Sequence, residues 1–411
     1  MSTRRRHFAI IAPPTVGHIN PLQALGTQLV ALGHRVTFVH QADVASLIDR
    51  PRIGFAPLAA PVEGPHALRA YNAVLATPTG PAGLLRMLRA TAAMSERLLS
   101  HAPQVVRAIG ADAVIADSAE SAGALLAEHL NLPCVVSVTG LPLLGEPDVP
   151  PPFLGWRYRP GAIGRFRNRG GYTVSERLMR PIAAVLERHR KAWNVDNGAS
   201  PPRLYVAQCP QSLDYPRKSL PARFHYGGPW RDPASTEAGL PIDERPLIFC
   251  SLGTLQGSRR RLLATMSEAC AAIGARAVIG HGGGLDLAEE AALPGDPLVR
   301  AFWPQEAVLR QCAAAILHGG FNTVLDSLAA GIPIVALPIA FEQPGTAARV
   351  AWVGAGAVLT ARSVSVRRLA DALQRVMSER AFSQAAARLS GEMQAAGGAP
   401  RAAALISEAL D

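Results

Sequence analysis

Short apolar runs alternate with helical patterns along much of this chain, and no other sequence feature restricts its fold as strongly. In the second half, strands are expected at 298–302, 313–317 and 332–337, with helices beginning at Gln305 and Phe321 between them. The N-terminal region repeats the pattern, with a strand at 7–12, leucines at helical spacing over 22–32 and a strand at 35–40. Because crossover helices join parallel strands, we expect an α/β fold with two doubly wound sheets.

The domain boundary is expected in a stretch rich in glycine and proline that begins at Tyr226. A length of 411 residues suits two ordinary domains, and a new apolar strand follows this stretch at 246–250. We therefore divide the chain into an N-terminal domain at 1–228, a linker at 229–245, a second domain at 246–385 and a helical tail at 386–411.

In the second domain, polar residues follow strands at the sheet edge where ligands bind in such folds. His318 ends one strand, and Gly320, Asn322 and Thr323 open the next helix, whose free backbone amides suit a phosphate. Asp326 lies one turn further on the same side and is expected to accept hydrogen bonds from ribose hydroxyls. Two further residues are expected at this edge: Trp303, with its ring facing a flat base, and Thr254, facing a diphosphate.

In the first domain, the turn after the first strand places His18 at the mouth of the sheet, near a helix N-terminus. We expect the positive helix end to disfavour the imidazolium, leaving His18 neutral and able to act as a general base. Asp117 ends a buried strand and is the expected orienting partner. Two alternatives remain: Asp117 caps a helix starting near Ser118, or Asp112 is the partner.

The order and spacing of the residues from Trp303 to Gln343 resemble the nucleotide-sugar signature of the UDP-glycosyltransferases. These are two-domain GT-B enzymes, so the resemblance implies two Rossmann-like domains facing each other across a cleft, the first binding the acceptor and the second the nucleotide sugar. It also implies that the tail packs back on the first domain. The Gly-His-x-x-Pro turn of His18 and the later Asp117 resemble the catalytic pair of this family.

The resemblance assigns a role to each residue of the signature. Trp303 stacks on uracil beside Gln305; His318, Asn322 and Thr323 contact the diphosphate; Asp326 holds the ribose; Glu342 and Gln343 hold the sugar hydroxyls. It implies UDP-glucose as donor substrate and no cofactor. No metal is expected either, because no histidine has a partner at metal-ligand spacing and no Asp-x-Asp pair is present.

Segments of both domains, such as 213–225, 251–257 and 318–349, are similar to the zeaxanthin glucosyltransferases of carotenoid biosynthesis. This similarity implies a carotenoid acceptor and an inverting transfer that yields a β-glucoside. Another hydroxylated acceptor, such as a macrolide, flavonoid or sterol, is the alternative within the enzyme class. A non-catalytic protein that binds sugar nucleotides or lipids is the alternative outside it. An oxidoreductase is disfavoured, since the first turn lacks Gly-x-Gly-x-x-Gly.

The formal charge of +10 is concentrated locally at 153–180, where seven arginines alternate with aromatic residues and Glu176 is the only acid. This pattern suits contact with an anionic membrane surface. A solvated loop is the alternative, and nucleic acid is disfavoured because no nucleic-acid fold motif accompanies the patch. Five scattered cysteines and the lack of a signal peptide favour a cytoplasmic protein, located at the inner face of the membrane if the segment binds lipid.

Overall fold

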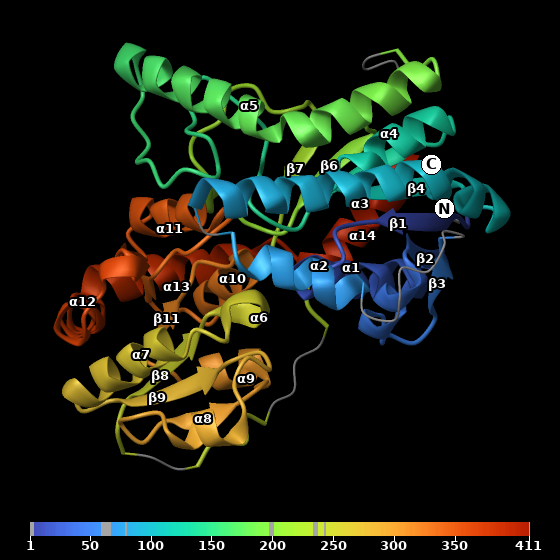
Figure 1. The fold of residues 1–411 in the computed structure, drawn as a ribbon. Helices are drawn as coiled ribbons and strands as arrows, with labels where there is room; N and C mark the ends of the chain where they lie inside the picture. The colour runs from blue at the N-terminus through green and yellow to red at the C-terminus, as the bar shows by residue number, and fades with distance from the viewer. Residues whose placement is uncertain are drawn as a thin grey trace.

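The computed structural model describes residues 4–58, 67–78, 80–196, 201–232, 237–241 and 244–410. Each half of the chain builds one sheet, and Figure 1 shows the two sheets in separate bodies. The strands of the N-terminal sheet are β1 (His7–Ile11), β2 (Arg35–His40), β3 (Ile53–Pro57), β4 (Ala113–Asp117), β5 (Cys134–Val138), β6 (Leu204–Ala207) and β7 (Phe224–Tyr226). The strands of the second sheet are β8 (Leu247–Ser251), β9 (Arg276–Gly280), β10 (Leu298–Arg300), β11 (Ala314–Leu317), β12 (Ile334–Ala336) and β13 (Gly356–Val358).

Both sheets are doubly wound, so the predicted fold class is confirmed. The strand order is β3-β2-β1-β4-β5-β6-β7 in the first sheet and β10-β9-β8-β11-β12-β13 in the second, and neighbouring strands run parallel. The order reverses between β1 and β4, and again between β8 and β11. Ligands of such sheets bind at these switch points, beyond the carboxyl ends of the strands.

Helices cover both faces of each sheet. Those of the first domain are α1 (Val16–Ala31), α2 (Ala67–Ala76), α3 (Gly80–Ala108), α4 (Ala122–His129) and α5 (Ala162–Ala192). Helix α1 begins earlier than the leucine spacing indicated, so His18 lies in its first turn. Ile19, Leu22, Leu25 and Leu29 form its buried stripe against the sheet.

The basic segment is largely helical, so the loop alternative is wrong from residue 162 onward. Helix α5 runs along the top of the molecule in Figure 1 and packs on α3. Its buried face carries small or polar residues, Gly164, Asn168 and Gly171, before Ile182 and Val185. Within the described ranges, the helices lack the combination of length and apolar character needed to cross a bilayer.

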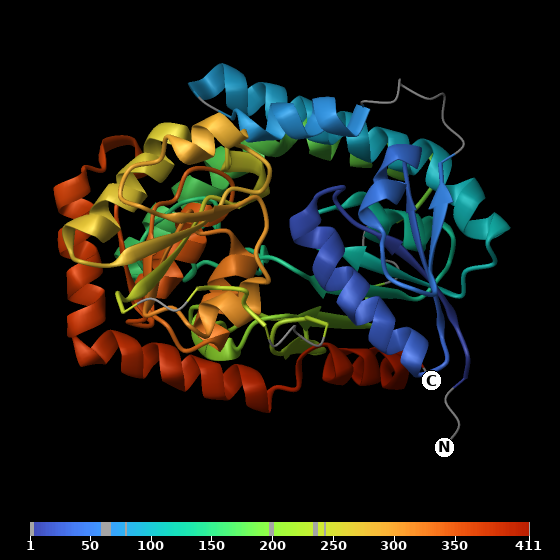
Figure 2. The ribbon, with the colours of Figure 1, turned by 90° about the horizontal axis from the view of Figure 1, so that it is seen from below.

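The helices of the second domain and tail are α6 (Gly253–Gln256), α7 (Arg260–Ala272), α8 (Leu287–Ala291), α9 (Gln305–Leu309), α10 (Phe321–Ala329), α11 (Gln343–Trp352), α12 (Val366–Ser378), α13 (Arg380–Ala395) and α14 (Gly398–Leu410). Helix α13 packs on α10, whereas α14 packs on α1 of the first domain, as Figure 2 shows. Ala403 and Ile406 join the core beside Leu22 and Leu25, and Ser407 Oγ lies 2.9 Å from His34 Nε2. The tail therefore divides at residues 396–397. Helix α13 stays with the second domain, and only α14 crosses to the first domain.

A buried ion pair joins the two domains. Arg349 of α11 donates from Nε to Asp214 of the first domain at 2.7 Å, and both side chains are almost fully buried. The guanidinium also lies 4.2 Å from the ring centroid of Tyr215. Between the domains, positions 233–236 and 242–243 of the expected linker lie outside the described residues.

Candidate active site at the facing sheet edges

The switch points of the two sheets lie against each other. His18 follows β1 and Asp117 ends β4, while Thr254 follows β8 and His318 follows β11. The side chain of Asn322, at the start of α10, donates from Nδ2 to the carbonyl oxygen of Gly17 at 2.6 Å. The residue before the expected base therefore touches the helix expected to hold phosphates.

His18 lies beside Asp117, as expected for a base and its carboxylate. His18 Nδ1 is 3.2 Å from Asp117 Oδ2, and Asp117 is fully buried. Asp117 also accepts a hydrogen bond on Oδ1 from the backbone of Ala119, but α4 begins at Ala122 with Ser121 as its N-cap. The alternative in which Asp117 caps a helix near Ser118 is therefore wrong. Asp112 is not the partner, because it accepts from the backbone of His7 at the start of β1.

The pKa of His18 is raised, so the expectation that the helix end keeps this ring neutral is wrong in direction. Burial opposes the imidazolium, but the charges of Asp117, Glu342 and Glu120 outweigh it. A raised pKa strengthens His18 as a proton acceptor and stabilises the imidazolium formed by proton transfer. The effect of Glu342 also shows that the second domain acts electrostatically on the base.

Glu120 is a buried acid near the base that the sequence reasoning did not identify. Its Oε1 accepts from Ser95 Oγ at 2.8 Å and from the backbone of Ala122 at 3.2 Å. Burial, aided by the charge of Asp117, raises the pKa of Glu120 to about 7 despite these bonds. The carboxyl edge of the N-terminal sheet, the first edge, therefore concentrates ionisable groups around His18.

His318 lies at the carboxyl edge of the second sheet, the second edge, and two glycines pack closely against its ring. A Cβ at Gly320 would lie 2.4 Å from His318 Nε2, and one at Gly253, whose φ is +70°, would lie 2.8 Å from the same ring. Burial lowers the pKa of His318 to about 4, so the ring is neutral at physiological pH. Its Nδ1 lies 3.4 Å from the carbonyl oxygen of Ser251, which can only accept, so the one N–H of the neutral ring points there and Nε2 keeps its lone pair. The structure therefore places His318 beside the start of α10, but its N–H is used within the protein.

The start of α10 presents the backbone amides that the sequence indicated. Gly320 is its N-cap without a side-chain bond, and Thr323 lies in the first turn, partly exposed. Thr254 lies within the short α6, which follows the neighbouring strand, and it is exposed. Asn322 differs from the expectation, because its side chain bonds to the first domain: to Gly17 and, through Oδ1, to Gln208 Nε2 at 2.8 Å.

Asp326 and Gln305 form one cluster with a linker residue. Arg231 Nε donates to Asp326 Oδ1 at 2.7 Å, and Gln305 Nε2 donates to Asp326 Oδ2. Arg231 also donates to both oxygens of Asn322. Asp326, expected at the ribose, and Gln305, expected beside Trp303, are thus held in place by an arginine that the sequence reasoning missed.

Trp303 is partly exposed and oriented by two contacts. Its Nε1 donates to the carbonyl oxygen of Ile279 at 2.9 Å, and Arg300 Cζ lies 4.2 Å from its ring centroid. Arg300 therefore covers one face of the indole.

Glu342 and Gln343 lie together at the start of α11 but differ in environment. Burial, together with the charge of Asp117, raises the pKa of Glu342, which is still partly exposed at the domain junction. Gln343 is buried, and its Oε1 accepts from the backbones of Ile339 and Ala340 at 3.0 and 2.9 Å. Glu342 is the better placed of the two to meet a ligand, while Gln343 shapes the loop before it.

Two further buried residues, Thr139 and Gln208, lie between the edges. Each directly follows a strand of the first sheet, the same signal that identified Asp117. Thr139 Oγ1 is 2.8 Å from His18 Nδ1, and Gln208 bonds to both Thr139 and Asn322. No motif surrounds either residue in the sequence, which explains why they were missed.

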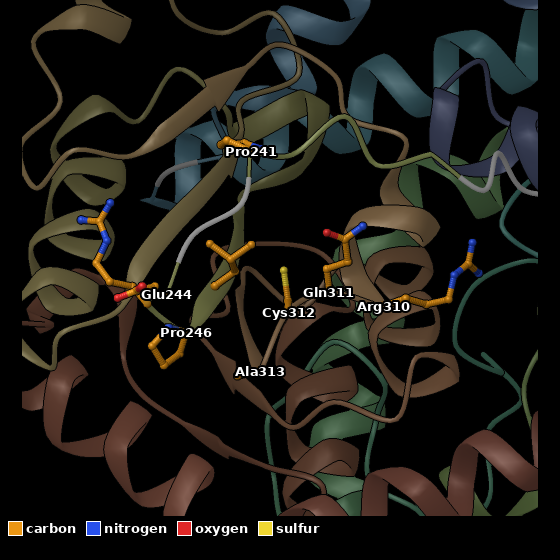
Figure 3. Close-up of a pocket in the computed structure, with 9 residues that line it drawn as sticks. Pro241, Glu244, Pro246, Arg310, Gln311, Cys312 and Ala313 are labelled. Atoms are coloured by element: carbon orange, nitrogen blue, oxygen red, sulfur yellow. The ribbon is translucent and has the colours of Figure 1, made fainter.

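A surface hollow lies away from these residues. A cavity of about 480 Å³, shown in Figure 3, opens at the amino ends of β8 and β11, beside Pro246, Leu247, Cys312 and Ala313. The expected site residues do not line it. We therefore place the candidate site at the carboxyl ends, where the sheets' switch points meet.

Comparison with known proteins identifies the family of the chain. Residues 8–142 match the glycosyltransferase family 28 N-terminal domain, and residues 278–410 match the C-terminal domain family of erythromycin biosynthesis protein CIII-like proteins. The chain is 36% identical to zeaxanthin glucosyltransferase of Pantoea ananas, over 98% of this chain and 96% of the relative. It is 34% identical to that of Pseudescherichia vulneris, over 98% of each. The glycotransferase of kitacinnamycin has the same fold, with a TM-score of 0.77 at 22% identity, over 99% of this chain and 100% of that one.

Proposed function

Since the chain belongs to the UDP-glycosyltransferases of the GT-B fold, the family that includes the zeaxanthin glucosyltransferases, we propose that it transfers glucose from UDP-glucose to a ring hydroxyl of a carotenoid such as zeaxanthin. The observation that carries the chemistry is the meeting of His18 and Asp117 with Glu342 and the start of α10 at one domain junction. Full-length similarity to two zeaxanthin glucosyltransferases supports the choice of acceptor.

In the proposed reaction, His18 Nε2 takes the proton of the acceptor hydroxyl while that oxygen attacks the anomeric carbon. The bond from this carbon to the diphosphate breaks, UDP leaves, and a single displacement inverts the configuration to a β-glucoside. Asp117 stabilises the imidazolium formed on His18. The N-terminus of α10, with the hydroxyls of Thr254 and Thr323, would stabilise the leaving diphosphate. The scheme requires no metal, because these donors supply the electrostatic stabilisation.

For the donor, three side chains at the second edge support the remaining assignments. Glu342 is proposed to accept hydrogen bonds from the sugar hydroxyls, and the partly exposed ring of Trp303 to stack on the uracil. Asp326 keeps lone pairs for ribose hydroxyls, since each of its oxygens accepts only one of the hydrogen bonds from Arg231 and Gln305.

The reaction is tested by incubating the purified protein with UDP-glucose and detergent-dispersed zeaxanthin, with UDP release and pigment mass as readouts. We expect one or two hexoses on the pigment, and none with the variant His18→Ala. UDP binding without any change in zeaxanthin would refute the carotenoid assignment and direct the search to macrolide, flavonoid or sterol acceptors. Equal turnover by wild type and His18→Ala would remove the proposed base.

We also propose that the enzyme works at a membrane surface, which it contacts through α5. Four apolar side chains form an exposed ridge along this helix: Ile163, Phe166, Val174 and Leu178. Phe166 is 80% exposed and Ile163 65%. Exposed arginines lie beside the ridge at 169, 177 and 180. An apolar ridge next to arginines matches the interface of an anionic bilayer.

The segment that leads into the ridge packs close to the candidate site. The loop before α5 packs against the start of α11, since a Cβ at Gly155 would lie 3.2 Å from Pro344, and one at Gly345 would lie 2.0 Å from the carbonyl oxygen of Pro152. Pro344 and Gly345 follow Glu342 and Gln343 directly. A lipid-dissolved acceptor would therefore reach the site beside the helix that contacts the membrane.

Membrane contact is tested by cosedimentation with vesicles of phosphatidylglycerol and phosphatidylcholine. We expect wild type to bind at least tenfold better than the double variant Ile163→Ser, Phe166→Ser, because both ridge positions lose their apolar contact with lipid. The matched control is Leu287→Ser, which removes an apolar residue 83% exposed on the other domain. Equal binding by the double variant would exclude the ridge as the membrane contact. Equally strong binding of wild type to vesicles of phosphatidylcholine alone would exclude a role for the arginines.

A further inference from the structure

Thr139 lies between the base and its carboxylate. It directly follows β5 and is 1% exposed. Its hydroxyl donates to Asp117 Oδ2. The hydroxyl oxygen, Thr139 Oγ1, lies 2.8 Å from His18 Nδ1. The Nδ1 to Oδ2 distance is longer, at 3.2 Å. The nearest polar atom to His18 Nδ1 in this triangle is therefore the threonine oxygen and not the carboxylate.

The hydrogen count of this triangle determines the form of the imidazole. A hydroxyl has one hydrogen, and the Thr139 hydrogen points to a carboxylate, which can only accept. Thr139 Oγ1 must then accept from His18, so Nδ1 carries the hydrogen in the neutral ring. This leaves Nε2 with its lone pair, and the side chain of His18 is 24% exposed, so a substrate can reach it.

Gln208 links the backbone of Thr139 to the second domain. Gln208, which is fully buried, donates from Nε2 to the Thr139 carbonyl oxygen and to Asn322 Oδ1. Its Oε1 accepts from the backbone of Trp230 at 3.3 Å and from Arg231 Nη1 at 3.0 Å. All hydrogen-bonding groups of this amide are used, so its orientation is defined.

We propose that Thr139 is a positioning residue for the base. It holds His18 in the tautomer whose Nε2 can take the proton from the hydroxyl of the acceptor substrate. Gln208 connects this arrangement to α10 of the second domain. The inference rests on the proposed function, because it takes His18 as the base. It adds a residue that acts through His18 rather than on the substrate.

The first test needs no acceptor. In ¹⁵N-histidine NMR spectra at high pH, the signals of His18 are identified by their loss in His18→Ala. We expect a protonated Nδ1 and an unprotonated Nε2 in wild type, and a mixture of tautomers in Thr139→Val, which has the same shape without the hydroxyl. A wild-type ring protonated on Nε2 would overturn the proposal even if the variant failed to fold.

The second test separates positioning from donor binding. We expect Thr139→Val to lower kcat about 10- to 100-fold, a part of what a general base contributes, with the KM for UDP-glucose within about twofold. Thr139→Ser keeps the hydroxyl and should retain activity within about threefold. A raised donor KM with unchanged kcat, or equal losses in Ser and Val, would overturn the proposal. Inactivity of wild type on every acceptor, with the expected NMR tautomer, would instead refute the proposed reaction.

Discussion

The two sheets present matching edges to the same junction, but the chemistry of the edges is opposite. The first edge surrounds His18 with carboxyl groups, and the pKa values of both His18 and Glu120 are raised. The second edge encloses His318 in glycines and lowers its pKa to about 4, beside the free amides of α10. One edge can gain a proton during a reaction, whereas the other offers fixed donors to an anion. Repeating an architecture therefore does not repeat its electrostatics.

The strongest test of this contrast is His18→Ala. We expect kcat/KM to fall about 10³-fold, within the range that a general base supplies, while the Kd for UDP changes less than twofold. The matched control is His225→Ala, which removes an exposed histidine on β7. Isothermal titration and initial rates measure the two effects. A large loss of UDP affinity would mean that the first edge also holds the anion.

Asp117→Asn should produce the next largest effect, about 100-fold in kcat/KM, because the imidazolium loses its neutralising charge. A base must be unprotonated, so activity falls as pH drops through the pKa of His18. Removing the carboxylate removes the charge that raises this pKa, so the acid limb of the pH-rate profile should move to lower pH. An acid limb that stays in place would contradict the assignment of Asp117.

At the second edge, Gly320→Ala should weaken UDP binding about tenfold. The new Cβ would lie 2.4 Å from His318 Nε2 and displace the ring beside the start of α10. The midpoint of the pH-rate profile should not change, because the first edge is untouched. Gly391→Ala is the control, since a Cβ there meets no atom within 4 Å. A shifted midpoint would show that the two edges do not act separately.

The smallest effect is expected from Glu120→Gln. With a pKa of about 7, Glu120 is mostly neutral at pH 6 and charged at pH 8, where its charge raises the pKa of His18. The variant should match wild type at pH 6 and differ by about two- to threefold at pH 8, as expected for one partly screened charge. Stopped assays across this range measure it. Equal profiles throughout would show that Glu120 does not influence the base.

The sequence predicted the elements and most of the strand-end residues, because strand and helix periodicities are local and a polar residue after a buried strand is conspicuous. It did not predict the direction of the His18 pKa shift, which is set by the balance of burial against Asp117 and, to a smaller extent, Glu342 and Glu120. Glu342 lies more than three hundred residues along the chain from His18. Gln208 and Arg231 were missed for a similar reason. Each acts by bonding to Asn322, and only the packed domains bring these residues together.

One edge of the molecule holds both places where the chain passes between the domains. A Cβ at Gly228 would lie 2.5 Å from the carbonyl oxygen of Met393, and one at Gly398 would lie 2.8 Å from that of Pro229. The two crossings thus touch backbone to backbone at the lower edge of Figure 2. Any rotation of one domain relative to the other that keeps these contacts must therefore turn about this one place, and the two connections between the domains act as a single joint.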